Sequence, residues 1–234
     1  AHFAFAPSRL TADHYARKLG REMAVLPTPA FEEVTALDLP PEGTPPRYLL
    51  HFANQLGARK GSDLVVEAAL LAQASAPDLT VVCVGTIEKP IRAQLQEQAA
   101  AAKGRIVLMP TLGKGAIYAL IRGAVATVLP SRIDNIPNAV LESLMFGVPV
   151  IGTLGSSIDE LVEPGVTGAL VENGSAQALF EAMIAAWRGD FPQSGSFRWG
   201  DTKLGHPYQP EVAAARYLEA IATALKSRPP KPQR

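Results

Sequence analysis

The chain of 234 residues has one cysteine, no net charge and no long hydrophobic run. The single Cys83 excludes an internal disulfide framework and is typical of a reducing compartment, so we expect a cytoplasmic protein with Cys83 in its core. The 22 basic and 22 acidic side chains cancel, which leaves no overall field to attract nucleic acid or an acidic membrane. No apolar run reaches the roughly 18 residues of a membrane span, and the first residues lack a signal-peptide pattern.

Several catalytic patterns are also missing. The four histidines, at positions 2, 14, 51 and 206, lack the spacing of metal ligands, so we expect no metal and no cofactor. His51 is interpreted as a core or pocket-edge residue of a strand. Neither the Gly-x4-Gly-Lys-Ser/Thr pattern of P-loop ATPases nor the Gly-x-Ser-x-Gly elbow of serine hydrolases occurs. Ser157 and Glu160 have the spacing of a capping box, which predicts a helix start rather than a reactive serine.

Short apolar runs alternate with helix-length segments through most of the chain. The predicted strands are 48–53, 80–85, 105–109, 126–129, 149–153 and 168–171, and the predicted helices are 62–74, 90–103, 115–122, 137–146, 158–162, 176–187 and 210–225. Apolar strands separated by helices predict an α/β fold, a Rossmann-like parallel sheet with helices on both faces. In such a sheet ligands bind beyond the carboxyl ends of the strands.

The two ends of the chain depart from this alternation. Residues 2–6, 10–19 and 23–26 predict a strand, a helix and a strand, and a proline-rich stretch follows at 39–46. We interpret 1–29 as the remnant of another domain, 30–46 as a linker, 47–190 as the sheet domain, 191–228 as a helical extension and 229–234 as a tail. Because Ala1 lies next to a predicted strand and is not a methionine, we expect further sequence upstream.

The loop after the first strand of the sheet domain has the pattern of a phosphate-binding loop. It contains Gly57 and Gly61 and leads into an apolar helix, and Lys60 is the cation best placed to meet a phosphate. Considered alone, the loop is equally consistent with a solvated pair, Arg59 and Lys60, in front of an ordinary helix.

The most informative stretch is PSRIDNIPNAVLESLMFGVPVIGT at 130–153, which holds two carboxylates eight positions apart. Pro137 suits the first turn of a helix, which puts Asp134 in the preceding loop and Glu142 in the second helical turn. Between them lie the free amides of the helix start, which form an anion site. A nucleotide-sugar needs carboxylates that bind its hydroxyls and amides that bind its phosphates.

Each carboxylate has two interpretations. In the first interpretation of Asp134, it or its neighbour Asn135 caps the helix. In the second, Asp134 contacts a sugar. Glu142 lies on a nearly apolar helix that we expect to be largely buried, where a carboxylate needs a partner. That partner is either a ribose diol, as in dinucleotide-binding folds, or a cation such as Arg132 or Lys60. We favour the ribose diol of a ligand over the cation as the partner of Glu142.

Taken in order, these segments resemble the carboxy-terminal, donor-binding domain of retaining glycosyltransferases with the GT-B fold, of the glycosyl transferases group 1 or family 4 type. The resemblance covers about residues 48–185. It rests on LGARKGSDLVVEAA, VVCVG, the Pro-Ser-x-x-acid block with Glu142, FGVPVIGT and ELVEPGVTGALVENG. It implies two Rossmann-like domains, with a nucleotide-sugar held mainly by this one and an acceptor held by another, of which residues 1–29 would be the end.

The resemblance also implies roles for single residues. Asp134 matches the first acid of the E-x7-E motif, which contacts the donor sugar, and Glu142 matches the second, which contacts the ribose. Lys60 would bind the diphosphate, and backbone near Thr111 would flank the base. The implied donor-binding residues are Gln55, Arg59, Lys60, Thr111, Asp134, Asn135, Ile136, Pro137, Asn138, Ala139 and Glu142, with Lys60 and Asp134 as the catalytic pair.

The implied activity is metal-free transfer of a sugar from a nucleotide diphosphate sugar, with retention at the anomeric carbon. A domain isolated from its acceptor domain would be inactive, and the missing domain could bring the protein to the inner membrane face. Gln55 stands where the family commonly carries an arginine on the diphosphate, which favours a second hypothesis, a non-catalytic nucleotide-sugar binding module. A nucleotide-sugar epimerase with the GT-B fold is a third hypothesis. It ranks last, because the acids and histidines on which such enzymes depend cannot be assigned to positions of this sequence.

Overall fold

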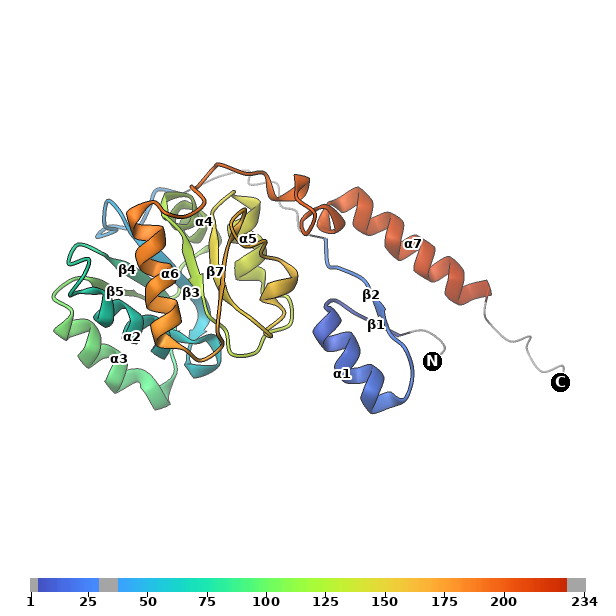
Figure 1. Cartoon of the computed structure of the whole chain (residues 1–234), viewed down its shortest axis with the longest axis horizontal. Helices are drawn as coiled ribbons and strands as arrows, with labels where there is room; N and C mark the ends of the chain where they lie inside the picture. The colour runs from blue at the N-terminus through green and yellow to red at the C-terminus, as the bar shows by residue number, and fades with distance from the viewer. Residues whose placement is uncertain (1–3, 30–37, 227–234) are drawn as a thin grey trace.

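The computed structural model describes residues 4–29 and 38–226 (Figure 1). Six parallel strands form one sheet in the order β5-β4-β3-β6-β7-β8. Their bounds are β3 Leu49–Leu56, β4 Val81–Ile87, β5 Ile106–Met109, β6 Thr127–Leu129, β7 Val150–Thr153 and β8 Gly168–Val171. Counted from β3 along the chain, this is the 3-2-1-4-5-6 order of a Rossmann fold, so the predicted fold class is confirmed.

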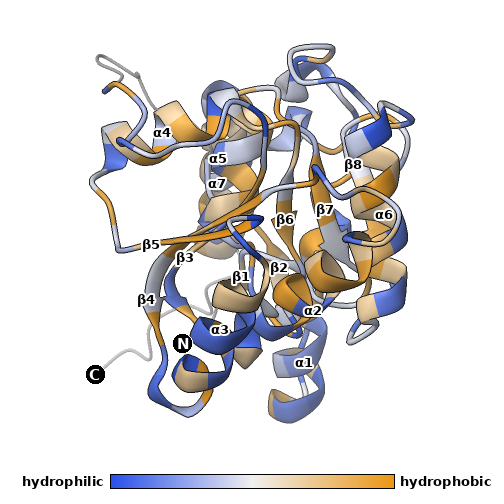
Figure 2. Ribbon diagram, turned by 90° about the vertical axis from the view of Figure 1, so that its left-hand side faces the viewer, coloured by the Kyte–Doolittle hydropathy of each residue, from blue (hydrophilic) through white to orange (hydrophobic). Residues whose placement is uncertain are grey.

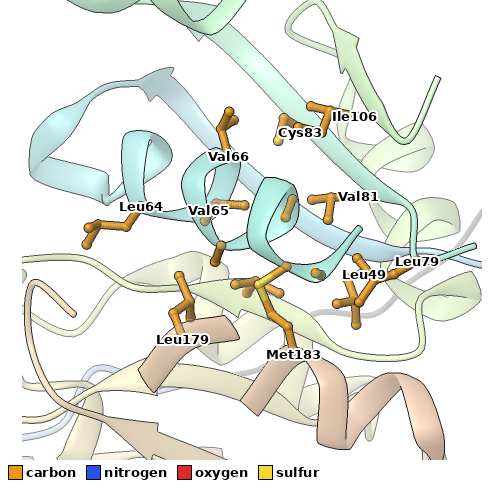
Figure 3. Close-up of a cluster of buried hydrophobic side chains, with 14 of the residues drawn as sticks. Leu49, Leu64, Val65, Val66, Leu79, Val81, Cys83, Ile106, Leu179 and Met183 are labelled. Carbon is orange, nitrogen blue, oxygen red and sulfur yellow. The ribbon is translucent and has the colours of Figure 1, made fainter. Parts of the chain in front are cut away.

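Helices cover both faces of the sheet. The helices α2 (Ser62–Ala72), α3 (Lys89–Ala101) and α6 (Ala176–Arg188) share a buried cluster with one face. Figure 3 shows side chains of α2 and α6 in this cluster. The helices α4 (Lys114–Gly123) and α5 (Asn138–Met145) share a second cluster with the other face. The strands are therefore apolar on both sides, and Figure 2 shows them mostly in hydrophobic colours.

Successive strand residues contribute to opposite clusters, as the period of two requires. Leu49 and Cys83 belong to the cluster under α2, whereas Leu50 and Val82 belong to the cluster under α4 and α5. Cys83 is 2% exposed, which confirms its predicted place in the core, and burial raises the pKa of its thiol to about 12. The thiol therefore stays protonated and serves as a small core side chain.

The ends of the described chain lie outside this sheet. The strands β1 (Phe5–Ala6) and β2 (Ala24–Val25) pair in parallel and are connected by α1 (Arg9–Leu19). The helix α7 (Pro210–Lys226) extends away from the sheet domain (Figure 1). This matches the predicted strand, helix and strand of the first segment. Residues 1–3, most of the predicted linker (30–37) and 227–234, which include the predicted tail, lie outside the described residues.

Two elements differ from their predictions. The predicted helix 158–162 is only a 3-10 turn, Ile158–Glu160, which follows Ser157 at φ 63 without a side-chain cap bond, so the predicted capping box is wrong. The strand β3 continues to Leu56, past the predicted end at 53, with a shift in its register against β4 between Phe52 and Gln55. The extra strand residues carry Gln55 beyond the sheet core to the edge where ligands bind.

The loop after β3 passes very close to the loop after β6. After a 3-10 turn, Ala58–Lys60, the backbone adopts φ +71 at Gly61, and a Cβ on Gly61 would lie 2.2 Å from the carbonyl oxygen of Pro130. A side chain at this position would push the two loops apart. The glycine thus fixes the distance between two loops that meet at the carboxyl edge of the sheet.

We expect Gly61→Ala to destabilise the protein more than Gly155→Ala does. Gly155 has the same φ of +71 but nothing within 4 Å of its Cβ position, so both variants share the left-handed strain of about 1–2 kcal/mol. The clash with Pro130 should add about 2 kcal/mol at Gly61. Urea unfolding of both variants measures the difference, and equal loss of stability in the two would contradict the close contact.

Candidate functional site

A cavity of about 900 Å³ opens at the carboxyl ends of β3 and β6, where the strand order reverses direction. This switch point is where ligands bind in open α/β sheets. Every residue predicted for the donor site lines the cavity, namely Gln55, Arg59, Lys60, Thr111, Asp134, Asn135, Ile136, Pro137, Asn138, Ala139 and Glu142. Residues up to 87 positions apart in the chain are thus brought to one site by the sheet topology.

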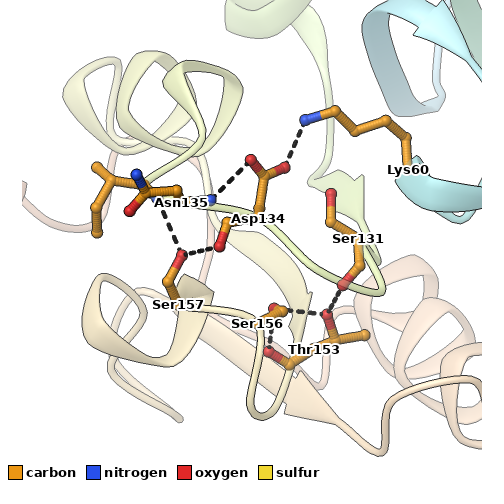
Figure 4. Close-up of polar contacts among 8 residues, drawn as sticks. Lys60, Ser131, Asp134, Asn135, Thr153, Ser156 and Ser157 are labelled. Carbon is orange, nitrogen blue, oxygen red and sulfur yellow. Dashed lines mark hydrogen bonds and ion pairs between the residues drawn. The ribbon is translucent and has the colours of Figure 1, made fainter. Parts of the chain in front are cut away.

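Lys60 and Asp134 form an ion pair across the cavity. The Lys60 Nζ lies 2.5 Å from Asp134 Oδ2, and the two side chains are 24% and 11% exposed (Figure 4). Lys60 is therefore not the solvated cation of the alternative interpretation, whereas Arg59 and Gln55 are exposed at the rim. The predicted phosphate cation and the predicted sugar acid are each other's partners in this structure.

Asp134 does not cap α5. The cap position is Pro137, with no side-chain cap bond, while Asp134 Oδ1 accepts a hydrogen bond from the amide of Asn135 at 3.0 Å. The Asn135 side chain does not cap the helix either, because its Oδ1 accepts a hydrogen bond from Ser8 Oγ at 2.8 Å. The capping interpretation of both residues is therefore wrong, and the Asp134 carboxylate is directed at Lys60.

Ser157 holds the loop that carries Asp134. Ile136 has φ 52, an uncommon conformation for a side chain branched at Cβ, and its amide donates to Ser157 Oγ at 2.9 Å. The same hydroxyl donates to the Asp134 carbonyl at 3.0 Å (Figure 4). Sequence reasoning assigned Ser157 to a capping box and missed this role, since a contact over 21 positions has no local signal.

These hydrogen bonds limit which amides can bind an anion. The amides of Asn135 and Ile136 are already used within the protein, and Pro137 has no amide hydrogen. The first amides of a helix have no intrahelical partner, so the amides of α5 that are left to meet an anion are those of Asn138 and Ala139. Both residues line the cavity.

Glu142 lies in the second turn of α5 and lines the same cavity, as predicted. It is half-buried between the buried residues Leu141 and Ser143. Arg132, one of the cations considered as its partner, is directed elsewhere, because its guanidinium donates to both carboxylate oxygens of Asp63 at 2.8 Å. Glu142 thus lines the cavity from the same helix whose first residues, Asn138 and Ala139, also line it.

Another part of the cavity lining comes from the end of β5 and from α4. Thr111 and Leu112 follow β5, and Ile117 projects from α4 into the same lining. The hydroxyls of Thr111 and Thr86 are 2.9 Å apart, and the Lys114 ammonium lies 5.5 Å from the ring centroid of Tyr118. Apart from Lys114, this part of the lining is apolar and hydroxyl-bearing, which suits a flat heteroaromatic group.

His51 joins three elements beneath the cavity. Its Nδ1 lies 2.7 Å from the Val128 carbonyl of β6 and its Nε2 lies 2.8 Å from Ser62 Oγ of α2. These partners assign a neutral ring that donates from Nδ1 and accepts at Nε2. Burial lowers the pKa of His51 from 6.5 to about 4. The residue lines the cavity and is also part of the core, so both halves of the sequence interpretation hold.

Glu160 fastens α1 to this site. Its carboxylate accepts hydrogen bonds from the amides of Arg9 at 2.7 Å and Leu10 at 3.0 Å, across about 150 positions of sequence. Ser8, the cap of α1, is also bonded to Asn135. The first turn of α1 is thus held against the loop that carries Asp134.

Neither a metal site nor a membrane-spanning helix is found among the described residues. No group of three or more His, Cys, Asp or Glu side chains within 4–29 and 38–226 is arranged to hold a metal ion. Over the same ranges, no helix has the length and hydropathy needed to cross a membrane.

Comparison with known proteins matches the same segment of the chain. The family described as Glycosyl transferases group 1 matches residues 41–193, more than half of the sequence. Glycogen synthase from Acidiphilium cryptum is 31% identical over 120 residues, which cover 50% of this chain and 25% of that protein. The D-inositol 3-phosphate glycosyltransferase of an Arthrobacter species is 27% identical over 208 residues, which cover 82% of this chain and 49% of that protein.

Solved structures share the fold. HepE from Anabaena, in complex with UDP, superposes with a TM-score of 0.78 at 17% identity, over 95% of this chain and 64% of HepE. The apo form of the lipopolysaccharide outer core galactosyltransferase WaaB gives 0.76 at 16% identity, over 95% of this chain and 62% of WaaB. The chain therefore spans less than two thirds of the length of each of these proteins.

The buried His51 predicts a loss of stability in acid. Its folded pKa is below its unfolded pKa of 6.5, so protonation favours unfolding, and the stability present above pH 6.5 is lost as the pH falls to about 4. The loss attributable to His51 should be about 3 kcal/mol. Urea unfolding between about pH 7.5 and about pH 4 should therefore show a weaker pH dependence for His51→Gln than for wild type.

His206→Gln is the matched control, because His206 is exposed. It should retain the pH dependence of wild type. An equally weak dependence in both variants would contradict the assignment to His51.

Proposed function

The chain belongs to the glycosyl transferases group 1 family, and on that premise we propose that its cavity binds a nucleotide diphosphate sugar as the donor for sugar transfer with retention at the anomeric carbon. One observation carries the proposal. Lys60, Asp134, Glu142 and the first amides of α5 converge on one cavity at the switch point of the sheet. This set offers a cation and amides for a diphosphate and two carboxylates for hydroxyls.

Each part of the donor has a matching part of the cavity. The Lys60 ammonium and the amides of Asn138 and Ala139 bind the diphosphate and stabilise its charge as it leaves. Glu142 accepts hydrogen bonds from the ribose hydroxyls, and Asp134 does so from the transferred sugar. The heteroaromatic base lies along Thr111 and its apolar neighbours. These residues hold the donor and stabilise the leaving group without a bound metal or cofactor.

The acceptor belongs to a second domain in this proposal. The pair β1–β2 has only two strands, and a parallel sheet of that size cannot bury both of its faces. We interpret β1, α1 and β2 as the edge of an acceptor-binding domain. The bonds from Glu160 to α1 hold this edge beside the sugar end of the cavity.

A non-catalytic binding module is the second candidate. It is favoured by Gln55, a neutral side chain that lines the cavity near Arg59 and Lys60 where another cation would strengthen leaving-group stabilisation. Sugar transfer by the whole protein distinguishes the candidates, because a module binds the donor without turnover. An epimerase is less well supported, since His51, which lines the cavity, has both ring nitrogens engaged within the core.

Donor binding should stabilise the protein. At 100 times the Kd, a bound donor raises stability by about 2.7 kcal/mol, which a thermal-shift panel of UDP-glucose, GDP-mannose and ADP-glucose detects. Glu142→Ala should reduce the shift because the ribose loses its carboxylate. Glu181→Ala, on the exposed face of α6, is the matched control and should leave the shift unchanged.

The outcomes of this panel are separable. No shift with any of the three donors, in a folded sample, would overturn the proposed donor site. A full shift in Glu142→Ala would remove only the ribose role of that residue.

The ion pair of Lys60 with Asp134 predicts that the cavity prefers a nucleotide-sugar to the nucleoside diphosphate without its sugar. A nucleoside diphosphate draws Lys60 away and leaves the Asp134 carboxylate without its cation, whereas a sugar supplies hydroxyls to that carboxylate. Asp134→Asn should therefore bind UDP more tightly and UDP-glucose more weakly, changing the ratio of the two Kd values roughly tenfold. Isothermal titration with both nucleotides measures this ratio.

Glu142→Gln supplies the comparison. The ribose is common to UDP and UDP-glucose, so this variant should weaken both and keep their ratio. An unchanged ratio in Asp134→Asn would refute the sugar role of Asp134.

A further inference from the structure

Arg132 ties the loop after β6 to the loop that carries Lys60. Its guanidinium donates from Nη1 and Nη2 to the two carboxylate oxygens of Asp63, each at 2.8 Å, and from Nη1 to the carbonyl of Ala58. Its backbone amide donates to the Arg59 carbonyl at 2.9 Å. A two-point arginine–carboxylate pair fixes direction as well as distance, so these bonds define how the two loops lie.

The contacts of Arg132 bracket Lys60. Ala58 and Arg59 precede Lys60 in the 3-10 turn, and Asp63 follows it in the first turn of α2. Lys60 itself reaches Asp134, which lies two positions after Arg132 on the opposite loop. A lysine ammonium sits on a flexible four-carbon stem, so its position depends on where the backbone of its turn is held.

Arg132 and Asp63 are not part of the cavity lining, although Arg59, Lys60, Ser131 and Asp134 are. Their side chains are 36% and 27% exposed, and partly exposed ion pairs add little to stability. Loss of the pair should therefore leave the fold intact and change the placement of the turn.

We propose that Arg132 and Asp63 are positioning residues that hold Lys60 at the diphosphate of the donor. The inference rests on the proposed function, since it assumes that Lys60 meets a diphosphate. It assigns neither residue a contact with the donor. Three links then set the gap between the loops: the close contact of Gly61 with Pro130, the bonds of Arg132, and the ion pair of Lys60 itself.

A double-mutant cycle in the full chain tests whether Arg132 acts through Lys60. The probe is whichever of UDP-glucose, GDP-mannose and ADP-glucose binds wild type most tightly, and its Kd is measured by titration for Arg132→Met, Lys60→Met and the double variant. In the wild-type background Arg132→Met should weaken donor binding about tenfold. In the Lys60→Met background the same change should weaken it less than about twofold, because no ammonium remains to be positioned.

Two further measurements separate positioning from a structural role. Binding of the phosphate-free nucleoside of the same donor should be unchanged by Arg132→Met, since a nucleoside makes no contact with Lys60. Asp63→Asn, which keeps one carbonyl acceptor, should show the same pattern with a smaller loss. Arg188→Met is the matched control, because Arg188 is an exposed arginine whose hydrogen bond is to the Ser75 carbonyl, and it should leave both Kd values unchanged.

Each outcome is decisive. Equal losses of donor affinity in the two backgrounds, or an equal loss of nucleoside affinity, would overturn the positioning role. So would unchanged donor binding in both Arg132→Met and Asp63→Asn, with Lys60→Met impaired. Absence of donor binding by folded wild type, or full binding by Lys60→Met, would instead overturn the proposed function on which the inference rests.

Discussion

The contact of Gly61 with Pro130 determines the geometry of the cavity, because it lets two loops approach within a distance that no Cβ allows. Parallel strands place their following loops at one edge of the sheet, but they do not by themselves bring two side chains into contact. Here the backbone contact puts Lys60 on one loop within 2.5 Å of Asp134 on the other. His51 joins the same two regions from below, through β6 and α2, so the pair is held by packing and not only by its own attraction.

The pairing of these two charges has a consequence for recognition. A lysine and an aspartate that are 24% and 11% exposed satisfy each other's charge in this structure. A ligand that replaces both partners, with an anion for Lys60 and hydroxyls for Asp134, leaves neither charge uncompensated. A ligand that replaces only one leaves the other partly buried without a counterpart, which costs free energy. Complementarity to a two-part ligand is thus a property of the pair rather than of either residue.

Much of the sheet domain could be predicted from the sequence, because its signals are local. Apolar strands at regular spacing, the glycines around Lys60 and the helix start at Pro137 each depend on neighbouring residues. The same patterns placed Glu142 in the second turn of α5, as observed. Local signals also indicated that Asp134 precedes this helix, although they could not distinguish a cap from a cavity residue.

The remaining features depend on contacts between distant segments. Ser157 and Glu160 match a local capping box, yet their side chains bond to Ile136 and to the start of α1. The bonds of Arg132 to Asp63 join positions 69 apart, and no spacing rule in one sequence indicates such a pair. The extension of β3 past residue 53 follows pairing with β4, which overrides the weak strand propensity of its polar residues.

Hydrogen bonds to Ser157 explain how the loop that carries Asp134 keeps a strained backbone. Ile136 at φ 52 and Ser157 at φ 63 each cost about 1–3 kcal/mol unless the surroundings enforce them. Ser157 bonds to the loop at the Ile136 amide and the Asp134 carbonyl, which compensates part of that cost.

Asn135 continues the connection to Ser8 at the start of α1, and Glu160, three residues after Ser157, binds the next two amides of that helix. A displacement of α1 relative to the sheet would therefore strain Asn135 and Glu160 together. Asn135 is the neighbour of Asp134 in the chain, and Ser157, three residues before Glu160, bonds to the Asp134 carbonyl. The acid that pairs with Lys60 in the cavity is thus positioned in part by a unit that lies outside the sheet domain.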